Sequence, residues 1–337
     1  MPEHLIIESY GSFFGKKSER LQIKEKGEVV REIPFFEVEQ VTIAGSGVTL
    51  STDAIYECIE SGIQINFLTN TGKPYAKIMS PTNSGTVKTQ REQLLGYFDH
   101  RGLLASKAFV EGKISNQINT LKYFARHRKQ TQQEVYEKMS EAVAGMEKIR
   151  GELEGLQGDS IDEKRPQLMS MEGRAANLYW EGVAAILGDK IDFSGREHRG
   201  TQDPVNSLLN YGYGMLYQQV WGSVILAGLE PFAGFLHVDR PGKPSLVLDM
   251  VEEFRSPVVD RTILAMLSKG FTPKMDEDRL DQGTRKELAG KILERLSGEE
   301  RFEGKKHRLK TVIQMQARHL ATFLRGEGRY KPFVASW

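Results

Sequence analysis

The spacing of the hydrophobic residues changes near residue 90 of the chain. Before that point, short runs alternate apolar and polar residues between Gly, Pro or charged positions, which is typical of half-buried β-strands. The run from Leu21 to Ile33 reverses near Lys26-Gly27 and predicts a β-hairpin. A Ser-led run over 51–62 has helical spacing and ends in glycine, so it predicts a short capped helix. Residues 1–80 are therefore predicted to form a β-rich, sandwich-like domain.

Beyond this domain the pattern predicts a linker and then helices. Residues 70–87 are rich in Gly, Pro, Ser, Thr and Asn, which is typical of a long turn or linker, and we place the linker between domains at 81–89. From Gln90 onward, apolar residues recur three and four positions apart, the spacing of amphipathic helices. The length of 337 residues favours about two domains. The predicted fold class is α+β, with a larger, all-α domain over 90–337.

Composition narrows the class of protein. Apolar residues make up 39% of the chain and charged residues 27%, which suits a globular protein with sizeable cores. No run of about 18 uncharged apolar residues occurs, so no transmembrane helix is expected. The first residues have no basic region before an apolar stretch, so they do not resemble a secretory signal, and we expect a cytoplasmic protein. The single cysteine, Cys58, excludes an intrachain disulfide and a multi-cysteine zinc site.

Charge is unevenly distributed, although the net charge is only +1. Residues 1–80 carry 8 basic and 11 acidic residues. Residues 81–133 carry 9 basic and 3 acidic residues, and residues 301–331 carry 9 and 2. Such local excess suits contact with a phosphate backbone. Solvated helix faces would give the same counts, so both interpretations stay open for these two segments.

Glu172 opens a helical pattern, EGRAANLYWEGVAAIL. On a helix it shares a face with Ala176, Tyr179 and Val183, and that face is expected to be buried. A buried carboxylate is costly unless it is paired or bound to a metal, so Glu172 is a candidate metal ligand. A glutamate at a helix start, stabilised by the helix dipole, would explain the same pattern. Glu181 lies on another face and is expected to be solvated.

Basic, amide and aromatic residues gather between 196 and 213. Arg196, His198 and Arg199 precede a turn, after which Asp203 and Pro204 suit the N-cap and first position of a helix. Arginine and tyrosine side chains can hold phosphates and stack on bases. A helix whose polar residues make internal hydrogen bonds is the alternative. The candidate DNA-binding residues in this segment and farther along the chain are Arg196, Arg199, Asn206, Tyr213 and Arg255.

The stretch 231–255 contains the histidine and acids that best suit a metal site. His237 has apolar neighbours, and Asp249 and Glu252 lie three residues apart, which places both carboxylates on one face of a helix. Taken singly, these residues could be a structural histidine and a solvated acid pair. Together with Glu172 they offer carboxylate oxygens and one imidazole nitrogen, a donor set that suits Mg²⁺ or Mn²⁺ better than structural zinc.

Several motifs together resemble a known protein family. In the second part of the chain these are EGRAANLYW, DPVNSLLNYGYG, AGFLH and SLVLDMVEEFR, and in the first part VTIAG, GIQINFLT and TGKPYAK. The chain is similar over nearly its whole length to the CRISPR-associated endonuclease that serves as the integrase of spacer acquisition, the first of the numbered Cas proteins. The resemblance implies that Glu172, His237 and Glu252 are metal ligands and that Asp249 is a further acid beside the metal. It also implies that the N-terminal domain mediates dimerisation and the helical domain is catalytic.

The resemblance also implies a reaction and its partners. A 3′-hydroxyl of a short DNA fragment, the prespacer, would attack a phosphodiester in the CRISPR repeat with the help of bound Mg²⁺ or Mn²⁺. The implied partners are this DNA, a second copy of the chain and the second numbered Cas protein, with no membrane. A stand-alone metal-dependent nuclease acting on branched or linear DNA would use the same site. A non-catalytic DNA-binding scaffold is a third hypothesis.

Overall fold

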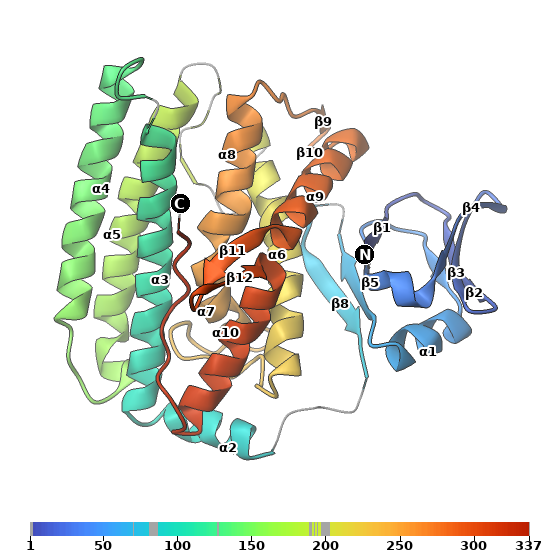
Figure 1. Cartoon of the computed structure of the whole chain (residues 1–337), viewed down its shortest axis with the longest axis horizontal. Helices are drawn as coiled ribbons and strands as arrows, with labels where there is room; N and C mark the ends of the chain where they lie inside the picture. Colours follow the sequence, from blue (N-terminus) through green and yellow to red (C-terminus); the bar gives the residue numbers. More distant parts are fainter. Residues whose placement is uncertain are drawn as a thin grey trace.

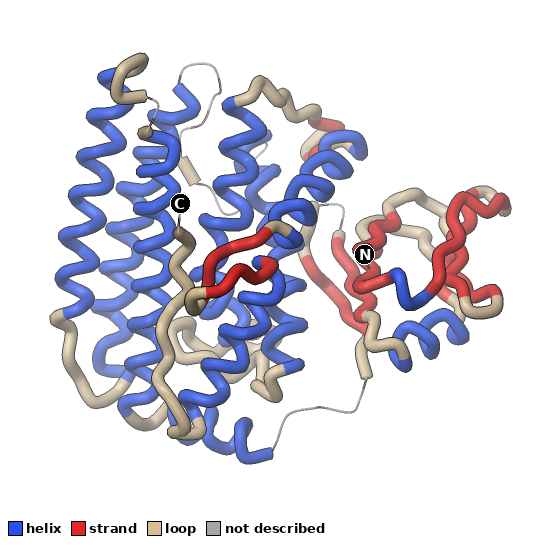
Figure 2. The backbone as a smooth tube through the Cα atoms, viewed as in Figure 1, coloured by secondary structure: helices blue, strands red, loops and turns tan. Residues whose placement is uncertain are grey.

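Strands and helices are segregated along the chain. The computed structural model describes residues 3–69, 71–80, 87–126, 128–188, 191, 193, 195–196 and 203–336. Figure 1 shows a strand-rich N-terminal part beside a larger helical part, and Figure 2 shows the same division by secondary structure. Each part has its own cluster of buried hydrophobic residues. The predicted α+β class, with a β-rich beginning and a mostly helical remainder, is confirmed.

The N-terminal part packs two sheets and one helix around a shared core. The first sheet has the strand order β1-β5-β7-β8, in which β8 alone runs antiparallel to its neighbour. The second has the order β4-β3-β2-β6, with β3 antiparallel to both neighbours. Leu5 and Val41 of the first sheet and Phe14 and Leu21 of the second are at most 1% exposed, so both sheets bury one face in the same core. The elements are β1 (Glu3–Ile7), β2 (Phe13–Lys17), β3 (Arg20–Glu25), β4 (Glu28–Pro34), η1 (Phe35–Glu37), β5 (Val38–Ile43), β6 (Thr49–Leu50), α1 (Thr52–Glu60), β7 (Gln64–Leu68) and β8 (Pro74–Ile78).

Two local predictions for this part are confirmed. The hairpin β3-β4 turns at Lys26 and Gly27, whose φ angles of 50° and 86° are the left-handed values that a two-residue hairpin turn needs. Helix α1 begins after Ser51, whose hydroxyl accepts a hydrogen bond from Ala54 N at 3.2 Å. Gly62, at φ 72°, follows the helix end.

The segment 70–87, which composition predicts to be a long turn or linker, contains a strand. Residues 74–78 form strand β8, which pairs with β7 and forms the edge of its sheet. Pro74 is the first residue of an edge strand, a position at which a missing N–H removes no essential ladder bond. The composition of this segment suggested a turn and hid its short strand. At the other end, α2 (Val87–Gly96) begins inside the predicted linker 81–89.

The helical part is built around α3 (His100–Ala125). Helices α4 and α5 lie beside it in Figure 1, while α7 and the turn that follows α7 also contact it. Phe109, Ile114 and Leu121 of α3 are fully buried, because the helix is covered by neighbours on more than one face. The remaining helices are α4 (Gln133–Glu154), α5 (Ile161–Leu187), α6 (Pro204–Leu226), α7 (Ser245–Phe254), α8 (Arg261–Ser268), α9 (Gln282–Ser297) and α10 (Leu309–Leu324).

Two features of this part were not predicted. It contains two short hairpins, β9 (Met275–Asp276) with β10 (Arg279–Leu280) and β11 (Glu299–Phe302) with β12 (Lys305–Arg308), so it is mostly helical rather than all-α. In addition, a six-residue π-helical turn, η3 (Arg255–Asp260), joins α7 to α8. A π-helical turn is wider than an α-helical turn and is often found at functional sites. Within the described residues, no helix combines the length and apolar character needed to cross a membrane.

Candidate active site

Asp249 organises the loop that carries His237. It is fully buried on α7, and its carboxylate accepts hydrogen bonds from the backbone N–H groups of Phe235, Leu236 and His237 at 2.7, 3.0 and 2.9 Å. The same carboxylate lies 2.7 Å from His237 Nδ1. Because a carboxylate accepts hydrogen bonds, it favours the tautomer with the proton on Nδ1, which leaves Nε2 with the lone pair that a metal or proton needs. Asp249 is therefore placed to orient the histidine.

The close approach of the loop to α7 depends on small residues. A Cβ atom at Gly234 would lie 2.6 Å from the backbone carbon of Ser245, so glycine is required there. Ser245 Oγ accepts a hydrogen bond from Gly234 N at 2.9 Å and donates to the carbonyl of Phe232 at 2.5 Å. These contacts fix the loop against the first turn of α7, four residues before Asp249.

The two predicted glutamate ligands lie close together, on either side of a lysine. Glu172 is in the middle of α5 rather than at a helix start, which rules out the helix-dipole explanation for its position. Lys113 of α3 donates a hydrogen bond to Glu172 Oε1, and its Nζ lies 2.8 Å from Glu252 Oε2. Arg255 Nη1 lies 2.9 Å from Glu252 Oε1. Burial alone would raise the pKa of Glu252, but Arg255 and Lys113 outweigh it and lower that pKa to about 2.

The four predicted residues form two pairs. Glu172 and Glu252 meet through Lys113, and His237 meets Asp249 directly. In the described part of the chain, no three His, Cys, Asp or Glu side chains are close enough to form a metal cluster. The donor chemistry nevertheless fits a hard divalent cation, because the carboxylates of Glu172 and Glu252 already share one cation, the Lys113 ammonium. Glu172, Glu252 and His237 Nε2 are the groups that would hold such an ion.

Lys113 was missed by the sequence reasoning. Its signal is a lysine between buried residues on a long helix, four residues after Phe109 and next to Ile114. A lysine in such a position needs a buried partner. Which partner it has could not be read from spacing, because Glu172 and Glu252 come from other helices.

The predicted DNA-binding residues divide into three groups. Tyr213 and Arg255 lie at the site: Arg255 stacks over the Tyr213 ring at 5.1 Å, and the Tyr213 hydroxyl donates to Asp260 at 2.5 Å. Arg196 also lies over the Tyr213 ring, 5.4 Å from its centre. Asn206 is only 1% exposed, and its amide binds Arg196 and Asp203, so a direct DNA contact by Asn206 is not supported. Arg199 lies outside the described residues.

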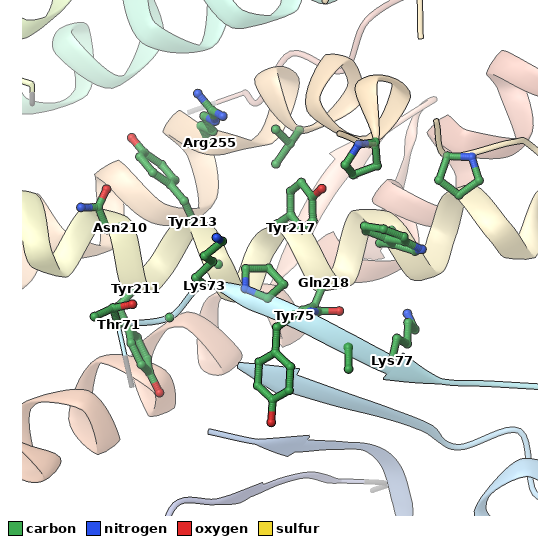
Figure 3. A pocket seen from close by; sticks show the side chains of 18 of the residues that line it. Thr71, Lys73, Tyr75, Lys77, Asn210, Tyr211, Tyr213, Tyr217, Gln218 and Arg255 are labelled. Atoms are coloured by element: carbon green, nitrogen blue, oxygen red, sulfur yellow. The ribbon is translucent and has the colours of Figure 1, made fainter. Parts of the chain in front are cut away.

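A large cavity opens beside this cluster. It has a volume of about 1140 Å³ and lies between β8 of the N-terminal part and α6 and α7 of the helical part, with Arg255 among its lining residues. Figure 3 shows aromatic and basic side chains around it, including Tyr75, Tyr217 and Lys77. Burial lowers the pKa of Lys77 to about 7. Aromatic and basic side chains line the cavity, which extends from strand β8 to Arg255.

The architecture is that of an α+β protein whose helical part carries a cluster of acids, histidine and arginine. The family model described as CRISPR associated protein Cas1 matches residues 5–294. The chain is 35% identical to CRISPR-associated endonuclease Cas1 1 of Archaeoglobus fulgidus, over 99% of each chain. It is 34% identical to CRISPR-associated endonuclease Cas1 of Korarchaeum cryptofilum, over 96% of this chain and 95% of that one. The chain therefore belongs to the Cas1 family.

Solved structures agree with this fold. A casposase bound to its integration product matches 98% of this chain and 93% of its own, with a TM-score of 0.81 and 22% identity. A chain of a Cas6-RT-Cas1–Cas2 complex matches 99% of this chain and 36% of its own, with a TM-score of 0.78 and 21% identity. A Cas1 protein from Thermotoga maritima matches 98% of this chain and 100% of its own, with a TM-score of 0.76 and 18% identity. At these identities the structural likeness concerns the fold.

Proposed function

We propose that this chain is a divalent-metal-dependent DNA endonuclease and integrase that inserts prespacer DNA into the CRISPR array. The observation that carries the proposal is the pair of contacts made by α7: Glu252 meets Glu172 of α5 at Lys113, and Asp249, three residues earlier, orients His237. The names of the curated relatives as endonucleases, and the family to which the chain belongs, support it.

The proposed metal is Mg²⁺ or Mn²⁺, held by Glu172, Glu252 and His237. When bound, it would polarise a phosphoryl oxygen and stabilise negative charge on the attacking or leaving oxygen. Asp249 keeps His237 Nε2 directed away from the carboxylate, and Arg255 lies where it can face a phosphate as well as Glu252. A 3′-hydroxyl as nucleophile gives strand joining, whereas water gives hydrolysis.

The proposed partners are prespacer and repeat DNA, a second copy of this chain and the second numbered Cas protein. We propose that residues 1–80 form the dimerisation domain and residues 90–337 the catalytic domain. The match to a chain of a Cas6-RT-Cas1–Cas2 complex and to a casposase bound to an integration product supports the protein and DNA partners. The basic and aromatic cavity beside Arg255 is compatible with DNA.

The test is a strand-joining assay with a labelled prespacer, a supercoiled plasmid carrying the repeat, and the partner protein. The wild-type chain should give joined product in Mn²⁺ or Mg²⁺ and none in EDTA. Glu172→Gln and His237→Ala should lose this product while retaining affinity for DNA. Glu181→Gln is the matched control, because Glu181 lies on the same helix but is exposed.

The competing functions give different results in the same assay. Nicking or digestion without joined product, even with the partner present, would identify a stand-alone nuclease and refute the integrase. Full activity of both Glu172→Gln and His237→Ala would show that the proposed site is wrong. If the wild-type chain binds DNA but neither cleaves nor joins it in the presence of metal, the result would favour the non-catalytic scaffold.

A further inference from the structure

Lys113 lies between the two glutamates that the proposed function assigns to the metal. Its side chain is 11% exposed, and it contacts Glu172 of α5 and Glu252 of α7 from the middle of α3. The neighbouring Gly112 explains how the lysine reaches this position. A Cβ atom there would lie 2.9 Å from Glu253 Cγ, so the glycine lets α3 approach α7 closely.

The charges in this cluster already balance. Glu172 and Glu252 contribute two negative charges, and Lys113 and Arg255 contribute two positive charges. Arg255 pairs with the other oxygen of Glu252 and stacks on Tyr213, so it is held outside the space between the two glutamates. Lys113 contacts both glutamates at once. A divalent cation bound between them would place two further positive charges beside the ammonium, which is strongly unfavourable at low dielectric.

We propose that Lys113 is an internal counter-cation that holds Glu172 and Glu252 together before metal binding and withdraws from at least one of them when the metal binds. The inference rests on the proposed metal site. Metal binding is then an exchange of cations, and the free energy needed to break the lysine contacts lowers the affinity for the metal.

The decisive measurement is Mn²⁺ binding to the full-length protein by titration calorimetry after removal of metals, at pH 8 so that carboxylates stay ionised. Lys113→Met should bind Mn²⁺ more tightly than wild type. Breaking one side of a buried ion pair costs several kcal/mol, so relief of even part of this cost should tighten binding by about tenfold or more. The metal-free variant should also melt at a lower temperature than wild type, and Mn²⁺ should raise its melting temperature by a larger amount. Equal or weaker Mn²⁺ affinity would overturn the proposal.

Matched variants separate this inference from the proposed function. Lys122→Met is the control, since Lys122 lies on the same helix and pairs with the exposed Glu147, away from the site. Its Mn²⁺ affinity should equal that of wild type. Glu172→Gln should weaken binding in the wild-type background. If it does and Lys113→Met does not bind more tightly, only the counter-cation idea fails. If Glu172→Gln has no effect on Mn²⁺ binding, the metal site and the inference fail together.

A second measurement covers the case in which Lys113→Met does not fold. Lys113→Arg keeps the positive charge and should bind Mn²⁺ no more tightly than wild type. NMR spectra of wild type and Lys113→Arg, both labelled with ¹³C-lysine, also identify the Lys113 Cε resonance, because that signal is present in wild type and missing in the variant. Diamagnetic Mg²⁺ should shift that resonance in wild type as the site fills. An unchanged Lys113 resonance at saturating Mg²⁺ would show that the lysine does not move, and the proposal would be wrong.

Discussion

Replacing Asp249 by asparagine should both destabilise the helical part and disorient His237. The carboxylate accepts three hydrogen bonds from backbone N–H groups and faces His237 Nδ1. Each of its two oxygens therefore contacts two of these four groups. An asparagine amide has only one acceptor oxygen, so two of these four buried groups would face an NH₂ group instead. A buried polar group left unpaired costs about 1–3 kcal/mol, which gives a loss of about 2–6 kcal/mol for the pair.

The assay for Asp249→Asn is urea denaturation followed by tryptophan fluorescence, together with the strand-joining assay. The free energy of unfolding should fall by the stated amount, and strand joining should fall as far as it does in His237→Ala. Asp239→Asn is the matched control, because Asp239 is exposed in the same loop and its carboxylate lies 2.8 Å from Ser245 Oγ. It should cost less than about 1 kcal/mol. A loss below about 1 kcal/mol in Asp249→Asn, with normal activity, would refute the argument that Asp249 holds the loop and the histidine.

Two further predictions concern the chain after α10. Burial raises the pKa of Glu253 to about 7, although Tyr330, Phe333 and Gln316 donate hydrogen bonds to its carboxyl group. The stability that Glu253 contributes is therefore complete below its unfolded pKa near 4.5 and is lost as the pH rises through about 7. Between pH 4.5 and 7, the free energy of unfolding of the wild type should decline by about 3 kcal/mol because of Glu253, and this decline should be absent in Glu253→Gln. Identical pH profiles of the two proteins would contradict the prediction. Phe333→Ala should lower the free energy of unfolding by about 3–5 kcal/mol, because Phe333 is fully buried and its ring centre lies 5.3 Å from that of Phe254. A melting temperature equal to that of wild type would show that the segment after α10 is not part of the core.

Local rules predicted the elements whose signals are short-range. The β3-β4 turn follows from Lys26-Gly27, and the cap of α1 from Ser51. The start of α5 was not located within the predicted helical domain. Ser160 caps this helix, accepting a hydrogen bond from Glu163 N at 3.4 Å, and the Ser-x-x-Glu spacing is a capping-box signal that could have located it.

The candidate site shows a similar division. The shared helix face of Asp249 and Glu252 could be read from their spacing, and the residue chemistry made Glu172 and His237 candidate companions. The family resemblance then implied that Glu252 is a ligand and Asp249 a neighbouring acid. The contacts that separate these two tasks could not be predicted from spacing. Asp249 faces a loop and Glu252 faces α3, and this depends on which neighbour packs on each side of α7. Spacing along one helix carries no information about those neighbours, so the contact with Lys113 emerged only from the tertiary structure.

The π-helical turn η3 makes the length of the chain between α7 and α8 as important as its composition. Successive residues of an α-helix are rotated by about 100°, so removing one residue from η3 would rotate α8 by about that angle relative to α7. Ile263 and Leu264, now in the core, would then point elsewhere, or Glu252 and Arg255 would turn away from Lys113 and Tyr213. The segment should therefore accept no single-residue deletion, which makes η3 a place where alignment gaps between functional relatives are not expected.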